Sequence, residues 1–111
     1  MLKQERRCFN RIPFRAPLRF QIRGKPSIYS AVCENISLGG LGFISEKFLA
    51  PATNLSLQIN ILSRVTSPFG RVISATPLLH SDRYHVGVEF ENLDLETRRR
   101  LIDYIQIQTT L

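Results

Sequence analysis

Hydrophobic and polar residues alternate along much of the chain, which is the pattern of a β-strand that buries one of its two faces. The alternation is regular in residues 55–61, where Leu and Ile occupy every second position, and again in residues 84–90. Residues 18–22 follow the same pattern, with Arg and Gln at the intervening positions. Further strands are predicted in residues 28–34, 41–45 and 69–80, with turns rich in Gly, Pro and Asn between them.

The hydrophobic spacing changes to that of a helix near the end of the chain. Asp94 is a residue type that caps helix N-termini, and Leu101, Ile102 and Ile105 follow at helical spacing. We therefore predict a helix over residues 94–107. About six short strands followed by one helix are typical of a small antiparallel β-barrel, here over residues 14–92, with the helix packed against it.

Length and composition fit one globular domain. The chain has 111 residues, of which 43% are hydrophobic, and no apolar run approaches the length of a membrane span. The basic N-terminus lacks the apolar stretch of a signal peptide, so we expect a cytoplasmic protein. Cys8 and Cys33 are far apart, and His80 and His85 flank an expected turn with no nucleophile or metal-ligand set nearby. We therefore expect no enzyme, no metal site and no bound cofactor.

The positive charge is concentrated at the N-terminus. Eight of the 15 Lys and Arg residues lie within residues 1–25 together with a single acidic residue, and the whole chain has a net charge of +6. Arg6, Arg7 and Arg11 lie within residues 1–12, a segment with few apolar side chains. Because like charges repel and few apolar groups are present to build a core, we predict that this segment is a flexible arm that meets an anionic partner.

The stretch "NISLGG" at residues 35–40 combines small polar residues with two glycines. Asn35 and Ser37 are two positions apart, so on an extended backbone their side chains point to the same side, while Ile36 points into the core. The two glycines permit either a positive φ or a very close approach of another group to the main chain. The stretch is therefore either a hydrogen-bonding platform or an ordinary turn, since Asn, Ser and Gly all favour turns.

Taken together, these two stretches resemble the signature of the PilZ domain family. That signature is an RxxxR element, here "RCFNR" at residues 7–11, followed by [D/N]xSxxG, here "NISLGG" at residues 35–40. The resemblance continues in "HVGVEF" and "ETRRRLIDYI", which are similar to the family's last strand and C-terminal helix. The resemblance therefore covers nearly the whole chain. We interpret residues 1–111 as a single PilZ-like domain.

The resemblance implies a receptor for the bacterial second messenger cyclic di-GMP, built on a six-stranded split barrel with a C-terminal helix. Arginines of the arm would hold guanine and phosphate, because the guanidinium fork binds either group through two hydrogen bonds. An arginine just before the RxxxR element further implies two ligand molecules per chain. The implied ligand-binding residues are Arg6, Arg7, Arg11, Asn35, Ser37, Gly39 and Gly40.

Two other functions fit parts of the sequence. A small basic β-barrel that binds single-stranded nucleic acid would account for the charge, but most Phe and Tyr residues lie on the apolar faces of their strands and not on exposed faces. A degenerate PilZ-like interaction module would account for the fold, but the arginine pair and the Asn-Ser-Gly set are intact. A receptor of this kind also requires a downstream protein partner, which the sequence does not identify.

Overall fold

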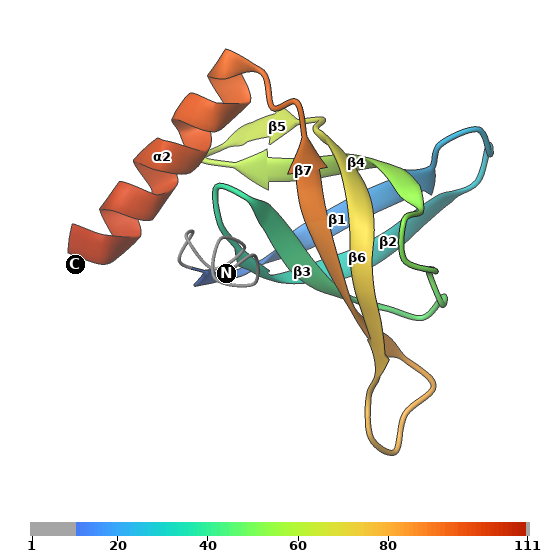
Figure 1. Cartoon of the computed structure of the whole chain (residues 1–111). Helices are drawn as coiled ribbons and strands as arrows, with labels where there is room; N and C mark the ends of the chain where they lie inside the picture. The colour runs from blue at the N-terminus through green and yellow to red at the C-terminus, as the bar shows by residue number, and fades with distance from the viewer. Residues whose placement is uncertain (1–10, 111) are drawn as a thin grey trace, which may run out of the picture.

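The computed structural model describes residues 11–110, which form seven strands and one helix (Figure 1). The helix, α2 (Leu95–Thr110), lies beside one end of the strands. The strands are β1 (Ile12–Ile22), β2 (Ile28–Ile36), β3 (Gly40–Ser45), β4 (Asn54–Ile61), β5 (Arg64–Thr66), β6 (Phe69–Pro77) and β7 (Tyr84–Glu91).

Six of these strands close into an antiparallel barrel. Neighbouring strands follow the order β1-β2-β3-β7-β6-β4, and β1 closes the ring by pairing with β4. In that closing pair Leu18 lies opposite Ile59, and Ile22 lies opposite Leu55. Strand β5 pairs with the end of β4 outside the ring. The predicted six-stranded barrel with a C-terminal helix is therefore confirmed, and β5 is an additional strand that the alternation did not indicate.

The core lies inside the barrel and consists of the inward-facing half of each strand. The alternating Leu and Ile residues of β4 are all buried, whereas Gln58 and Asn60 between them are exposed. Phe20 of β1 and Phe43 of β3 contact each other across the core, with their ring centroids 5.1 Å apart. The period of two in the sequence thus translates directly into one buried and one outer face of the barrel.

The helix α2 packs on the barrel through its apolar stripe. Leu101 is fully buried, and the ring of Tyr104 meets the ring of Phe14 edge-on at a centroid distance of 5.1 Å. The helix extends to Thr110, beyond the predicted end at residue 107. Within residues 11–110, α2 is the sole helix, and it is not long and apolar enough to cross a membrane.

Strand β1 begins earlier than its hydrophobic pattern suggested. It starts at Ile12, the last residue of the predicted arm, and a β-bulge interrupts its pairing with β2 between Pro13 and Ala16. The prolines and the bulge break the alternation that identifies a strand in sequence. The rest of the predicted arm, residues 1–10, lies outside the described residues.

Asp94 caps α2 as predicted, and this contact makes the stability of the fold depend on pH. The backbone N–H of Thr97 donates to Asp94 Oδ1 at 2.7 Å. The hydrogen bonds from Thr97 lower the pKa of Asp94 below its usual value of 3.8. Because the folded-state pKa is depressed, the stabilising contribution is present above the unfolded pKa and is lost as the pH falls through the folded pKa.

We expect Asp94→Ala to lower the thermal unfolding midpoint at pH 7, because the backbone N–H and the side chain of Thr97 at the helix start lose their acceptor. The difference from the wild-type protein should begin to shrink below about pH 4, where Asp94 of the unfolded chain takes up a proton, and should disappear as the pH falls through the lower folded-state pKa of Asp94. Thermal unfolding followed by circular dichroism between pH 2 and pH 7 measures this. Asp94→Asn is the control, since Asn also caps helices but does not titrate. An Ala variant as stable as the wild type at pH 7 would contradict the capping role.

Candidate functional site

A β-bulge in β2 places Asn35 on the outer face of the barrel. Cys33 and Ile36 are both fully buried, although in a regular strand residues three apart point to opposite faces. The bulge between Cys33 and Asn35 resets this alternation, so that Glu34 and Asn35 both lie outside the core. The Cys33 thiol donates to the carbonyl oxygen of Asn35 at 3.4 Å, and burial raises the pKa of this thiol to about 12. The hydrogen bond from the buried Cys33 thiol thus holds the bulge in place from inside the core.

Arg11 contacts Asn35 directly and thereby joins the two sequence motifs. Its Nη1 donates to Asn35 Oδ1 at 2.7 Å, because the start of β1 pairs with the end of β2 where Pro13 lies opposite Asn35. The contact occupies one of the five N–H groups of the guanidinium. Arg11 is exposed and forms no ion pair with any of residues 11–110. Its other donors remain available to an anion.

Ser37, in contrast, is buried in the turn between β2 and β3. Its Oγ accepts hydrogen bonds from the backbone N–H groups of Gly39 and Gly40 at 3.1 Å and 3.2 Å. Its own backbone N–H donates to the carbonyl oxygen of Gly40 at 2.8 Å. Only 3% of Ser37 is exposed, so these contacts give the residue a structural role in the turn. The predicted contact between Ser37 and a ligand stays a prediction.

Gly40 is needed for the close approach of β7. A Cβ atom at this position would overlap the backbone carbonyl oxygen of Val88, which belongs to the neighbouring strand. Gly39 contributes to the same junction, since its carbonyl oxygen accepts a hydrogen bond from the Phe90 N–H at 2.9 Å. The sequence left two roles open for the glycine pair, a positive φ and a close approach to the main chain. The structure shows the close approach, at Gly40. Among the described glycines, the positive φ occurs at Gly24 instead.

The floor beneath the Asn35 side chain is formed by Gly42, which the sequence analysis did not single out. A Cβ atom on Gly42 would lie 3.1 Å from both polar atoms of the Asn35 carboxamide and 3.1 Å from Cε1 of His85. The two side chains therefore meet above a bare stretch of backbone. Gly87 continues this floor on β7, where it lies opposite Gly42 in the register of the two strands and beneath the Ser74 side chain. The register brings these residues together, and nothing in the local sequence of either strand indicates it.

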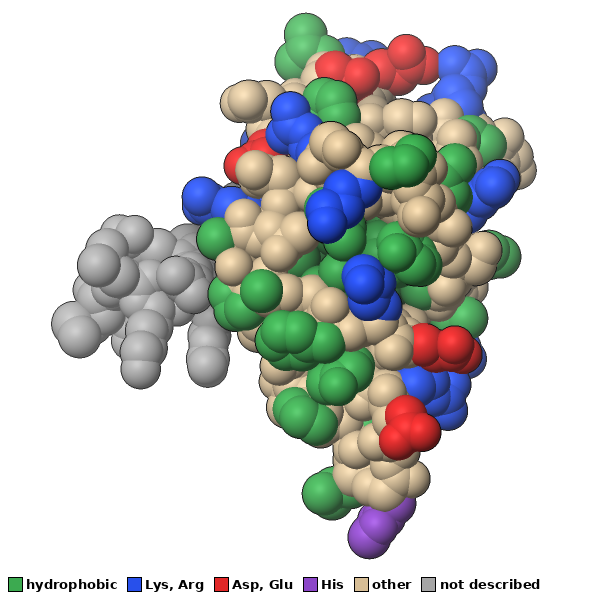
Figure 2. Space-filling model, turned by 90° about the vertical axis from the view of Figure 1, so that its right-hand side faces the viewer, with side chains coloured by type: hydrophobic (Ala, Val, Ile, Leu, Met, Phe, Trp, Pro, Cys, Tyr) green, Lys and Arg blue, Asp and Glu red, His purple; other side chains and the backbone are tan. Residues whose placement is uncertain are grey.

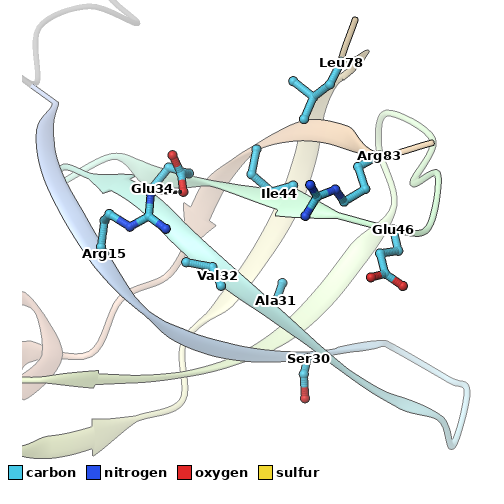
Figure 3. A pocket seen from close by; sticks show the side chains of 9 residues that line it. All are labelled: Arg15, Ser30, Ala31, Val32, Glu34, Ile44, Glu46, Leu78 and Arg83. Atoms are coloured by element: carbon cyan, nitrogen blue, oxygen red, sulfur yellow. Dashed lines mark ion pairs between the residues drawn. The ribbon is translucent and has the colours of Figure 1, made fainter. Parts of the chain in front are cut away.

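A cavity of about 460 Å³ lies on the same outer face, beside this glycine floor (Figure 3). Three residues lie opposite one another on β2, β3 and β7, namely Val32, Ile44 and His85. They form the next outward-facing row of the sheet after the row of Asn35, Gly42 and Gly87. The volume is within the range of small-molecule sites. The lining residues include Arg15, Val32, Glu34, Ile44, Leu78 and Arg83.

Ion pairs neutralise several arginines of the barrel, among them Arg15 at the cavity. Arg15, Arg23, Arg64 and Arg71 each lie within 3.6 Å of a glutamate carboxylate. On the face drawn in Figure 2, Lys and Arg side chains are scattered among hydrophobic ones and do not form a continuous stripe. Arg6 and Arg7 lie outside the described residues. Within residues 11–110, no group of three or more His, Cys, Asp and Glu side chains is placed to hold a metal ion.

Comparisons with known proteins agree with this fold. The chain superimposes on the Bacillus subtilis inhibitor of motility MotI/DgrA with a TM-score of 0.78 and 17% identity, over 93% of this chain and 51% of that one. It therefore spans about half of MotI/DgrA. The PilZ domain of YcgR from Escherichia coli, solved with cyclic di-GMP, gives a TM-score of 0.75 and 16% identity over 95% of this chain and 93% of that domain.

A third similar structure is the PilZ domain of CeSA from a cellulose-synthesizing bacterium, with a TM-score of 0.65 and 19% identity over 89% of this chain and 98% of that one. No curated protein matches the sequence. The family model described as the PilZ domain matches residues 5–106, which include both sequence motifs, all seven strands and most of α2. This chain therefore belongs to the PilZ domain family.

Proposed function

We propose that this chain is a receptor for cyclic di-GMP. The observation that carries the proposal is the 2.7 Å hydrogen bond from Arg11 to Asn35, which joins the two family motifs above the backbone of Gly42. Similar PilZ structures support it, since those of Escherichia coli YcgR and Borreliella burgdorferi PlzA were solved in complex with cyclic di-GMP.

The chemistry of the ligand matches these groups. Cyclic di-GMP has two phosphodiester charges and two guanines, each with O6 and N7 acceptors on one edge. A guanidinium binds phosphate or that guanine edge through two parallel hydrogen bonds, and it also stacks on a base. Arg11 supplies such a group at a fixed place, and the Asn35 carboxamide beside it offers both a donor and an acceptor. A side chain at Gly42 would displace the Asn35 carboxamide, which lies over this residue.

Ligand binding is proposed to order the N-terminal arm over the barrel. Arg6 and Arg7 would add their charges to that of Arg11, and the ligand phosphates would remove the mutual repulsion of the three arginines. The arm, the ligand and the rim of the barrel then form a new surface, which we propose is recognised by a protein partner in the cytoplasm. Part of the binding free energy is consumed in ordering the arm.

Limited trypsin digestion tests the closure of the arm. Saturating cyclic di-GMP should slow cleavage after Arg6, Arg7 and Arg11 strongly, because a bound and ordered segment does not fit a protease active site. Cleavage after Arg23 and Arg64, which lie on other parts of the barrel, serves as the internal control and should be much less affected. Equal cleavage of the arm with and without bound ligand would show that the arm does not close.

Calorimetric titration tests the function itself, with GMP and a short single-stranded RNA as controls. We expect saturable binding of cyclic di-GMP and weaker binding of GMP, which has one base and one phosphate. The same titration gives the stoichiometry, for which the sequence predicts two ligand molecules per chain. Saturable binding of RNA without binding of cyclic di-GMP would favour the nucleic-acid function. Against that function, Phe14, Phe20 and Phe43 are buried and cannot stack on bases.

A further inference from the structure

The β6–β7 hairpin projects from the barrel beside the cavity of about 460 Å³ (Figures 1 and 3). The floor of this cavity is apolar, because the outward-facing Val32 and Ile44 lie opposite each other on β2 and β3. Val32 is 41% exposed although it is hydrophobic. A planar aromatic group that covered this floor would remove apolar surface from water.

Arg83 extends from the base of the hairpin over β3 towards Ile44 (Figure 3). Its backbone is fixed, since its N–H donates to Ser81 Oγ at 3.0 Å and its carbonyl oxygen accepts from the Leu78 N–H at 2.9 Å. Its guanidinium forms no ion pair with any of residues 11–110, in contrast to Arg15 on the other side of the cavity, which lies 3.2 Å from Glu34. Arg83 thus has a fixed backbone and extends its positive charge over an apolar floor.

His85 connects the cavity to the Arg11–Asn35 pair. It lies opposite Ile44 in the register of β3 and β7, and its Cε1 reaches the space above Gly42, on the side facing the Asn35 carboxamide. The ring is half-buried, so one part packs on the sheet while another part is accessible. His85 therefore lies between the Arg11–Asn35 pair and Ile44, which lines the cavity on the side of Arg83.

We propose that Arg83 and His85 are further ligand-binding residues, and that one base of the ligand lies on the Val32–Ile44 floor beneath the Arg83 guanidinium. This inference rests on the proposed function and assigns the hairpin as the second wall of the same site. The Arg83 guanidinium stacks on a guanine or pairs with a phosphate. The His85 ring contacts the ligand between the Arg11–Asn35 pair and the cavity.

Titration of matched variants with cyclic di-GMP tests the proposal. Arg83→Gln should weaken binding about tenfold or more, and His85→Ala several-fold, because each removes a ligand contact. Arg64→Gln loses the same charge from a surface near α2, and His80→Asn alters the hairpin tip, where φ is 56° and Asn is tolerated. Both control variants should bind within about twofold of the wild type, and unfolding midpoints verify that all four variants fold.

Proton NMR of the wild-type protein provides a readout that needs no variant. The chain has two histidines, so their Cε1 proton signals can be resolved and assigned. Added cyclic di-GMP should shift the signal of His85 and leave that of His80 nearly unchanged. If the wild type binds but Arg83→Gln and His85→Ala bind normally and the His85 signal does not move, the inference is wrong while the proposed function stands. If the wild type does not bind, both are wrong.

Discussion

Replacing Arg11 with Ala is expected to weaken the binding of cyclic di-GMP roughly thirtyfold or more, which corresponds to about 2 kcal/mol. Two contributions add in the same direction. The ligand loses a charge-assisted contact, and the Asn35 carboxamide loses the 2.7 Å hydrogen bond that holds it beside the Gly42 floor. Because Arg11 is exposed and contacts no core group, the unfolding midpoint should not change. Calorimetric titration together with thermal unfolding measures both effects.

Two further variants separate charge from geometry. Arg11→Lys keeps the positive charge but not the planar fork, so it should restore only part of the affinity. Arg19→Ala removes an exposed arginine of β1, eight residues further along the chain, and should bind nearly as the wild type does. Normal binding by Arg11→Ala would show that the junction of the two motifs is not the ligand site. Arg7→Ala should behave like Arg11→Ala, since the RxxxR element places both in the arm.

The sequence predicted the strands whose alternation is undisturbed. Strand β4 is the clearest case, because each of its Leu and Ile residues enters the core of a barrel with one solvated face. The start of β1 could not be predicted in the same way, since Pro13, Pro17 and the bulge interrupt the period of two. Strand β5 has three residues, which is too few for periodicity to show.

The site was predictable where its residues belong to local motifs and not where strand register assembles it. The two motifs indicated that Arg11 and Asn35 belong to one site, and the structure brings these two side chains together. Gly42 and His85 come from strands whose register no local pattern specifies, and Arg83 reaches the neighbouring cavity from a hairpin. The contacts of Ser37, in contrast, need no strand register, because they lie within one turn and serine favours turns.

Gly40 gives the second large expected effect, this time on the fold. Gly40→Ala should destabilise the protein by about 3 kcal/mol or more, because the new methyl group would overlap the Val88 carbonyl oxygen. That oxygen belongs to the backbone of β7, which cannot move without breaking its pairing with β3. The unfolding midpoint should fall by roughly 10 °C in a domain of this size. Thermal and urea unfolding of purified Gly40→Ala measure the loss.

Gly42→Ala is the matched control, since it adds the same methyl group two residues further along the same strand. At that position the nearest atoms are the side-chain ends of Asn35 and His85 at 3.1 Å, which can move by a few tenths of an ångström. Gly42→Ala should therefore fold nearly normally and bind cyclic di-GMP more weakly, because the methyl group displaces Asn35 and His85. The two glycines of β3 thus separate stability from binding. If Gly40→Ala proved as stable as the wild type, the close approach of β7 would not be what requires a glycine there.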